Sequence, residues 1–414
     1  MTTAQLLAVV IISALLFPAS SRGQEARSLT LAEALARARE QNPDLLTARQ
    51  ELDIARGRLV KAQYPNQFNP ELGGAAARRH FAAAPGGSTD FDITLSQELE
   101  VAGQRGKRIA EARLNLAKVA QQVSDTERLL LTQVKEAFYR SLYLKRRVEL
   151  FREVETVNRR LRDIAASRFQ AGDVAKMEVN VAEVRLGQAR KDTIVAARDY
   201  RAALQDLERL LGLEPAGTLA PREQLTARPQ PFQHDRLLQL ALANRPDLQA
   251  AITEQQRVAA ETALTRRLIA PNPTLQAFYR REEGGDTIAG GAVSFPLPLF
   301  DRKQAELTQL AGRAGQARYE RQSVELRIRQ EVRDAFRSYE AAREEVEVFE
   351  TAVLDRAAEN FQLMETAYRE GKIDLLQLIV VQNDLVNAQF SYVDSLWNYW
   401  QAHTALERAV GQDL

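Results

Sequence analysis

Two long tracts of the chain carry apolar residues at the spacing of an α-helix, with Arg, Glu, Lys and Gln on the faces between them. In the first tract the apolar positions run Leu116, Val119, Val123, Leu130, Val134, Phe138, Leu144, Val148, Phe151, Val154, Leu161 and Ile164. An apolar stripe between charged faces is typical of a coiled-coil helix rather than of a helix buried in a globular core.

Proline and glycine, the residues that most disfavour a helix interior, are missing from the same tracts. No proline lies between Pro85 and Pro215, and none follows Pro298. Glycine is equally absent from residues 107–171 and 316–370. The pattern therefore predicts two uninterrupted helices.

The predicted helices span residues 104–169 and 302–369, and at about 1.5 Å per residue each is roughly 100 Å long. A lone glycine, Gly172 or Gly371, follows each of them, and a second helical pattern follows the glycine. Glycine at such a position fits a left-handed C-cap. We therefore expect two very long helical hairpins with Gly172 and Gly371 at their tips.

Ahead of each hairpin the pattern changes to the alternation of a β-strand. Residues 71–81 and 91–99 form one candidate pair of strands, and residues 275–281 and 287–295 form another. Each strand is about ten residues long, which is the length of a tilted membrane-spanning strand. Two surface β-hairpins on a soluble protein are the alternative.

The alternation is clearest in the strand at 91–99. Apolar residues alternate with polar ones there: Phe91, Ile93 and Leu95 with Asp92, Thr94 and Ser96. In a membrane barrel the apolar set faces lipid and the polar set faces a wet lumen. We expect Tyr64, Phe68, Phe278, Tyr279 and Phe295 to form the aromatic girdle of such a barrel.

Four strands cannot close a barrel, and an open strand edge cannot lie in lipid because its backbone groups would be unpaired. If these strands span a membrane, several copies must share one barrel. Three copies would supply twelve strands.

The chain is built of two similar halves. Asn42-Pro43-Asp44-Leu45 recurs as Arg245-Pro246-Asp247-Leu248, and Asn69-Pro70-Glu71-Leu72 recurs as Asn272-Pro273-Thr274-Leu275, in each case about 200 positions later, as in a duplicated unit. We expect four segments: a signal peptide at 1–23, a first repeat at 24–215, a proline-rich linker at 216–231 and a second repeat at 232–414.

The composition narrows the class of protein. The 56 Lys and Arg residues nearly cancel the 55 Asp and Glu residues, which leaves no electrostatic footprint for nucleic acid. Cysteine is absent, so disulfides and thiolate sites are excluded. The apolar run from Leu6 to Phe17 is typical of a signal peptide, although no Lys or Arg precedes it. These features favour an exported protein.

No enzymatic motif or metal-ligand spacing is present. The three histidines, His80, His234 and His403, are far apart and none has a second ligand three or four positions away. We therefore expect neither catalysis nor a cofactor or bound metal. The aromatic residues Trp397, Tyr399 and Trp400 near the last helix end are expected to pack between helices.

The order of these motifs resembles the TolC family of outer-membrane efflux proteins over essentially the whole mature chain. The residues that carry the resemblance are the following segments: Leu29-Thr-Leu-Ala-Glu-Ala-Leu35 leading into Asn42, the two Asn-Pro-x-Leu motifs, Ser294-Phe-Pro-Leu-Pro-Leu-Phe-Asp-Arg302, and the paired tips. The Phe-Pro-Leu-Pro-Leu-Phe-Asp stretch and the tip Glu370-Gly-Lys-Ile-Asp-Leu-Leu376 look most like the CzcC-type, heavy-metal branch.

The resemblance implies an α+β, mostly α fold. Long coiled-coil-like hairpins and four membrane strands per protomer would form a homotrimer, with a twelve-stranded barrel in the outer membrane of a Gram-negative bacterium and an α-helical tunnel in the periplasm. It also implies docking to a periplasmic membrane-fusion adaptor and an inner-membrane RND-type pump. Heavy-metal cations are the substrate that the branch suggests. The alternative is a soluble periplasmic coiled-coil structural protein.

The resemblance also implies roles at the tips. Members of the family often place acids six and nine positions after the second tip glycine, where this chain has Gln377 and Val380, whereas Glu178 matches the sixth position in the first hairpin. Glu178 is therefore the expected member of an aperture ring of carboxylates that attracts cations. Four nearby charges are expected to form the inter-helix pairs that hold the mouth shut: Asp173, Lys176, Lys372 and Asp374.

Overall fold

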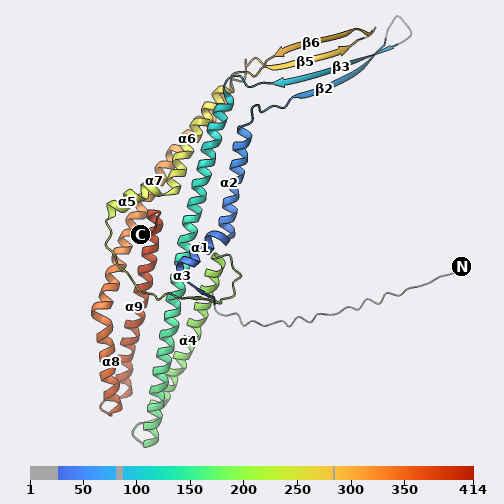
Figure 1. The fold of residues 1–414 in the computed structure, drawn as a ribbon. Coiled ribbons are helices and arrows are strands. Elements are labelled where there is room, and N and C mark those ends of the chain that lie inside the picture. Colours follow the sequence, from blue (N-terminus) through green and yellow to red (C-terminus); the bar gives the residue numbers. More distant parts are fainter. Residues whose placement is uncertain (1–26, 81–86, 283–284) are drawn as a thin grey trace, which may run out of the picture.

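The computed structural model describes residues 27–80, 87–282 and 285–414. The molecule is elongated, with a four-stranded sheet at one end and the tips of two helical hairpins at the other (Figure 1). The expected signal peptide at 1–23 and residues 81–86 and 283–284 lie outside the described residues.

The two halves contain matching elements. The first half contains β1 Arg27–Leu29, α1 Leu31–Gln41, α2 Pro43–Ala62, β2 Glu71–His80, β3 Gly87–Glu98, α3 Gln104–Ala171 and α4 Lys176–Leu210. The second half contains β4 Leu219–Pro221, α5 His234–Asn244, α6 Pro246–Arg267, β5 Thr274–Arg281, β6 Thr287–Ser294, α7 Gln304–Val348, the π-helix η2 Phe349–Val353, α8 Leu354–Arg369 and α9 Leu375–Val410.

The first predicted long helix is confirmed, but the second is interrupted. α3 runs unbroken over 68 residues. In the second hairpin a π-helical turn separates α7 from α8, and the backbone N–H of Leu354 bonds to Phe349 O, five residues earlier. A π-turn accommodates an extra residue without proline or glycine, so the absence of breakers could not exclude it.

Strands β2, β3, β5 and β6 form one antiparallel sheet in that order, so the two hairpins of the repeats lie side by side. β2 and β6 are its edges. A second, parallel pair, β1 with β4, joins the starts of the two halves near α1. The predicted strands are thus confirmed, and they belong to one sheet.

Equivalent buried positions fasten α2 and α6. The side chain of Asn42 caps α2 by accepting from Leu45 N at 3.0 Å, and its amide donates to Leu210 O at 2.9 Å. In the second half the residue at this place is Arg245, which is 3 % exposed and donates to Ala409 O at 3.2 Å. In both repeats the residue before this helix thus donates a hydrogen bond to a backbone carbonyl near the end of a hairpin helix. The donor is an asparagine in the first repeat and an arginine in the second.

Aromatic side chains join the two halves. Trp400 of α9 stacks on Tyr139 of α3 with ring centroids 3.8 Å apart, and Trp397 stacks on Tyr143 at 5.5 Å. Tyr399 is buried and donates to Arg228 O at 2.8 Å, and the Trp400 indole donates to Thr226 O at 3.2 Å. The predicted helix-packing role of this cluster is confirmed, and it also anchors the segment after β4.

Candidate functional site

The strand register sorts the sheet into two chemically different faces, because residues directly opposite each other in neighbouring strands share a face. One face, called here the apolar face, carries exposed hydrophobic side chains from all four strands. Its members are Leu72, Phe91, Ile93, Leu95, Leu275, Tyr279 and Val293. No other part of the described chain covers them.

The opposite face, called here the polar face, carries Asp92, Thr94 and Ser96. Two ion pairs join strands on it: Arg79 to Asp90 at 2.9 Å and Arg280 to Asp92 at 3.1 Å. Thr94 also donates to Asp92 at 2.8 Å. The alternation expected from the sequence is therefore present, while its assignment to lipid and lumen stays a prediction.

The proposed aromatic girdle needs one correction. Phe278 and Tyr279 are consecutive in β5 and so point to opposite faces. Tyr279 lies on the apolar face opposite Ile93, whereas Phe278 lies on the polar face, where its ring covers Gly290. A Cβ at Gly290 would come within 2.5 Å of that ring. Phe278 therefore cannot share an outward-facing girdle with Tyr279.

Both hairpins turn at the predicted glycines. Gly172 has φ 84° and Gly371 has φ 72°, which is the left-handed region that favours glycine. After the second turn Asp374 caps α9 and accepts from Gln377 N at 2.8 Å, while the Gln377 side chain accepts from Asp374 N at 3.1 Å. Gln377 thus has a structural role in a capping box.

The expected inter-helix ion pairs do not form within one chain. Asp374 is engaged in its cap, and Lys372 pairs with Glu370 of the same turn. Asp173 and Lys176 are exposed and have no ion pair in the described part of the chain. Pairing of these charges with another copy stays a prediction.

An apolar cluster holds the two hairpins together close to their tips. Its buried members come from α3, α4, α8 and α9, and they are Leu161, Ala165, Ala182, Tyr368, Leu375, Leu378 and Ile379. Tyr368 is fully buried, although it lies only three residues before the tip glycine. The helices next to the two turns are therefore packed against each other, while the turn residues themselves are exposed.

Three polar groups meet at the edge of this cluster. The Arg168 guanidinium lies 5.0 Å from the centre of the Tyr368 ring. One carboxylate oxygen of Glu178, the Tyr368 hydroxyl and one guanidinium nitrogen of Arg168 are buried without a hydrogen-bond partner among the described residues. Burial raises the pKa of the Tyr368 hydroxyl, the charge of Glu178 raises it further, and Arg168 opposes them. A buried polar group without a partner carries a desolvation penalty, so these three groups destabilise the contact that they share.

The sequence identified Glu178 but missed Arg168 and Tyr368. The duplication held a signal for Tyr368, because the equivalent residue of the first hairpin is Phe169, which is 42 % exposed. A hydroxyl gained at one repeat and not at the other indicates a position where the hairpins differ. Arg168 has no such signal, since it is one of many arginines on α3.

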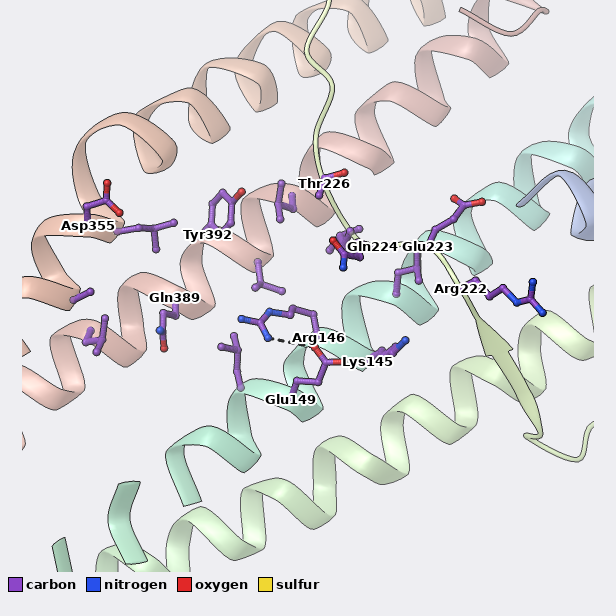
Figure 2. Close-up of a pocket in the computed structure, with 18 residues that line it drawn as sticks. Lys145, Arg146, Glu149, Arg222, Glu223, Gln224, Thr226, Asp355, Gln389 and Tyr392 are labelled. Carbon is purple, nitrogen blue, oxygen red and sulfur yellow. Dashed lines mark hydrogen bonds and ion pairs between the residues drawn. The ribbon is translucent and has the colours of Figure 1, made fainter. Parts of the chain in front are cut away.

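A cavity of about 620 Å³ lies between the hairpins, next to the π-turn. Figure 2 shows Lys145, Arg146 and Glu149 of α3 facing Gln389 and Tyr392 of α9, with the segment that follows β4 passing over them. Arg146 pairs with Glu149 at 3.3 Å. The lining mixes charges of both signs with leucines and defines no reaction chemistry.

The histidines do not meet. His80 ends β2, His234 begins α5, and His403 is half-buried in α9, where desolvation lowers its pKa. Among the described residues, no three His, Cys, Asp or Glu side chains are placed to hold a metal ion.

None of the helices in the described ranges is both long enough and apolar enough to cross a membrane.

Comparison with known families and relatives gives one consistent result. The model of a family described as outer membrane efflux protein matches residues 34–213 and 237–412. The chain is 26 % identical over 403 residues to the cobalt-zinc-cadmium resistance protein CzcC of Cupriavidus metallidurans, covering 96 % of this chain and 92 % of that protein. It is also 26 % identical to the outer membrane efflux protein BepC of Brucella suis, covering 94 % and 87 %.

Solved structures show the same fold. The outer membrane protein VceC of Vibrio cholerae superposes with a TM-score of 0.77 at 17 % identity and covers 92 % of this chain and 96 % of its own. The MtrE outer membrane channel of Neisseria gonorrhoeae gives 0.75 at 18 % identity, with 92 % and 89 % covered.

The two faces of the sheet predict different tolerance to charge. Ile93→Arg should destabilise the membrane-inserted protein by roughly 2–4 kcal/mol if this position lies near the bilayer midplane. Thr94→Arg, on the polar face, should insert normally and change conductance. The folded fraction is measured by heat-modifiable migration in the outer-membrane fraction, and equal tolerance at both positions would show that the face assignment is wrong.

The tip predicts a role for Glu178 in cation passage. Glu178→Gln should lower cation preference and weaken block by divalent cations from the tip side, because a carboxylate would be lost from the expected aperture. Glu183→Gln, an exposed carboxylate further along α4, is the matched control and should change neither. Single-channel recordings of both proteins make the comparison, and unchanged selectivity and block in the Glu178 variant would remove Glu178 from the aperture.

Proposed function

The chain belongs to the outer membrane efflux protein family, and from this membership we propose that three copies form a passive export duct. The family match covers both repeats, and this observation carries the proposal. The protein is an outer-membrane channel protein of a Gram-negative bacterium with a large periplasmic part, and it is not an enzyme. The soluble structural alternative is thereby set aside.

The open edges of the sheet support the trimer. β2 and β6 each have one unpaired side, and they run antiparallel to each other, so β6 of one copy can continue the sheet into β2 of the next. Closure of three such sheets gives a twelve-stranded antiparallel barrel in which every backbone group is paired. The apolar face then meets lipid, and the polar face with its two ion pairs lines the lumen.

The helical hairpins supply the tunnel and its docking end. Their tips point away from the sheet (Figure 1), which places them deep in the periplasm. There they would meet a periplasmic membrane-fusion adaptor and, through it or directly, an RND-type pump of the inner membrane. The duct itself carries no group able to supply energy, so transport depends on the pump.

The joint of Arg168, Tyr368 and Glu178 is suited to control the mouth. It connects α3 and α4 of the first hairpin with α8 of the second, at a place where the packing already leaves polar groups unsatisfied. Separation of the hairpins would hydrate all three groups, which lowers the net cost of opening.

We assign heavy-metal cations as the cargo class. The similarity to the cobalt-zinc-cadmium resistance protein CzcC over nearly the whole of both chains supports this assignment. The carboxylate of Glu178 would give the mouth of the duct a preference for cations. Selection of the particular metal would reside in the pump, because a passive duct conducts what the pump delivers.

Trimerisation is tested by mass. Detergent-extracted full-length protein should have the mass of about three protomers of 46.4 kDa each, less the signal peptide, by light scattering corrected for detergent. It should also dissociate on heating before electrophoresis. A stable monomer that still conducts ions in a bilayer would contradict the shared barrel.

The cargo is tested by complementation. Loss of the gene should lower tolerance of its bacterium to one or more divalent metals such as cobalt, zinc or cadmium, and intracellular metal should rise. The matched control is tolerance to organic antibiotics, which should stay unchanged. If loss of the gene lowers tolerance to antibiotics and leaves metal tolerance unaltered, the proposed duct stands and the metal assignment is overturned.

A further inference from the structure

Four arginines lie at the far end of the sheet, the end remote from the helices, and they fall on opposite faces in pairs. Arg79 and Arg280 belong to the polar face, where Asp90 and Asp92 neutralise them at 2.9 and 3.1 Å. The charges of this face are therefore satisfied within the chain.

The other two, Arg78 and Arg281, belong to the apolar face. Arg78 lies opposite Thr89 and Arg281 lies opposite Phe91, in the rows beyond Ile93 and Tyr279. Both arginines are exposed, and neither has an ion pair among the residues that the structure describes. Within the described residues these two guanidinium groups have no counter-charge, and they border an otherwise hydrophobic surface.

The neighbouring residues indicate that Arg78 and Arg281 lie at the membrane–water interface of the proposed barrel. Phe91 and Tyr279 lie next to them on the same face, and aromatic residues concentrate at membrane–water interfaces. Arginine at such a boundary extends its charged end toward the headgroups and keeps its aliphatic stem along the apolar surface. The two side chains start from strands two spacings, about 10 Å, apart and are offset by two residues, about 7 Å, along the strands, so the extended side chains can reach one lipid headgroup together.

Resting on the proposed barrel, we propose that Arg78 and Arg281 form a binding site for the phosphate groups of the glycolipid in the outer leaflet of the outer membrane. The sheet end that carries them is opposite the periplasmic hairpins and hence faces the cell exterior (Figure 1). Guanidinium binds phosphate with two parallel hydrogen bonds, which an ammonium group cannot reproduce. Phe91 and Tyr279 would contact the acyl chains below.

The site is tested by titrating the purified, heat-modifiable full-length protein with lipid A that carries both phosphates and with the same lipid after dephosphorylation. Native mass spectrometry counts the bound lipid. A basic residue near an anionic surface contributes about 1 kcal/mol, or roughly fivefold in affinity. The unaltered protein should therefore prefer the phosphorylated lipid by about 25-fold, and R78Q/R281Q should lose that preference.

The matched control is R79Q/R280Q, which removes the same charge from the same strands on the polar face and should keep the preference. R78K/R281K, which retains the charge, should keep part of it, and it provides the comparison if the control does not fold. A folded protein that binds both lipids equally overturns the lipid site, as does an equal loss in the control. A protein that never becomes heat-modifiable in the membrane contradicts the barrel instead.

Discussion

The unpaired edges of the four-stranded sheet, β2 and β6, are the main physical constraint on how this protein assembles. In hydrocarbon each unpaired backbone group costs several kcal/mol, so β2 and β6 cannot end in lipid. In the proposed trimer, pairing of these edges between copies would make assembly a condition of insertion. It would also fix the helical hairpins in a ring, since each pair of strands continues into a long helix. The ring of hairpins and the closure of the barrel would then follow from one requirement.

Most of the fold followed from local rules in the sequence. Missing proline and glycine predicted α3, a lone glycine predicted each tip, and alternation predicted the sheet faces. These features depend on residues close in sequence. The π-turn at Phe349–Val353 is different, because it contains no proline or glycine from which it could have been predicted.

Residues of the candidate site could be predicted only from the family's tip pattern or from the two-residue alternation of the strands. Glu178 was singled out as an aperture residue, a role that stays a prediction, and Ile93 and Thr94 were correctly placed on opposite faces. Tyr368 and Arg168 were missed, because their meeting depends on two hairpins that are about 200 residues apart along the chain. The face of Phe278 was misjudged, since an aromatic side chain does not by itself show which face of the sheet it occupies.

The unlike tips have a consequence for recognition. One hairpin turns through Gln-Ala-Gly-Asp and the other through Arg-Glu-Gly-Lys, so the two tips carry different charges on the same backbone turn. Around a trimer they would alternate, giving six similar shapes but only threefold chemical symmetry. A ring of six identical partner subunits would have to bind in two quasi-equivalent ways, as coat proteins do in a viral shell. A ring of three partner subunits could bind only one of the two kinds of tip.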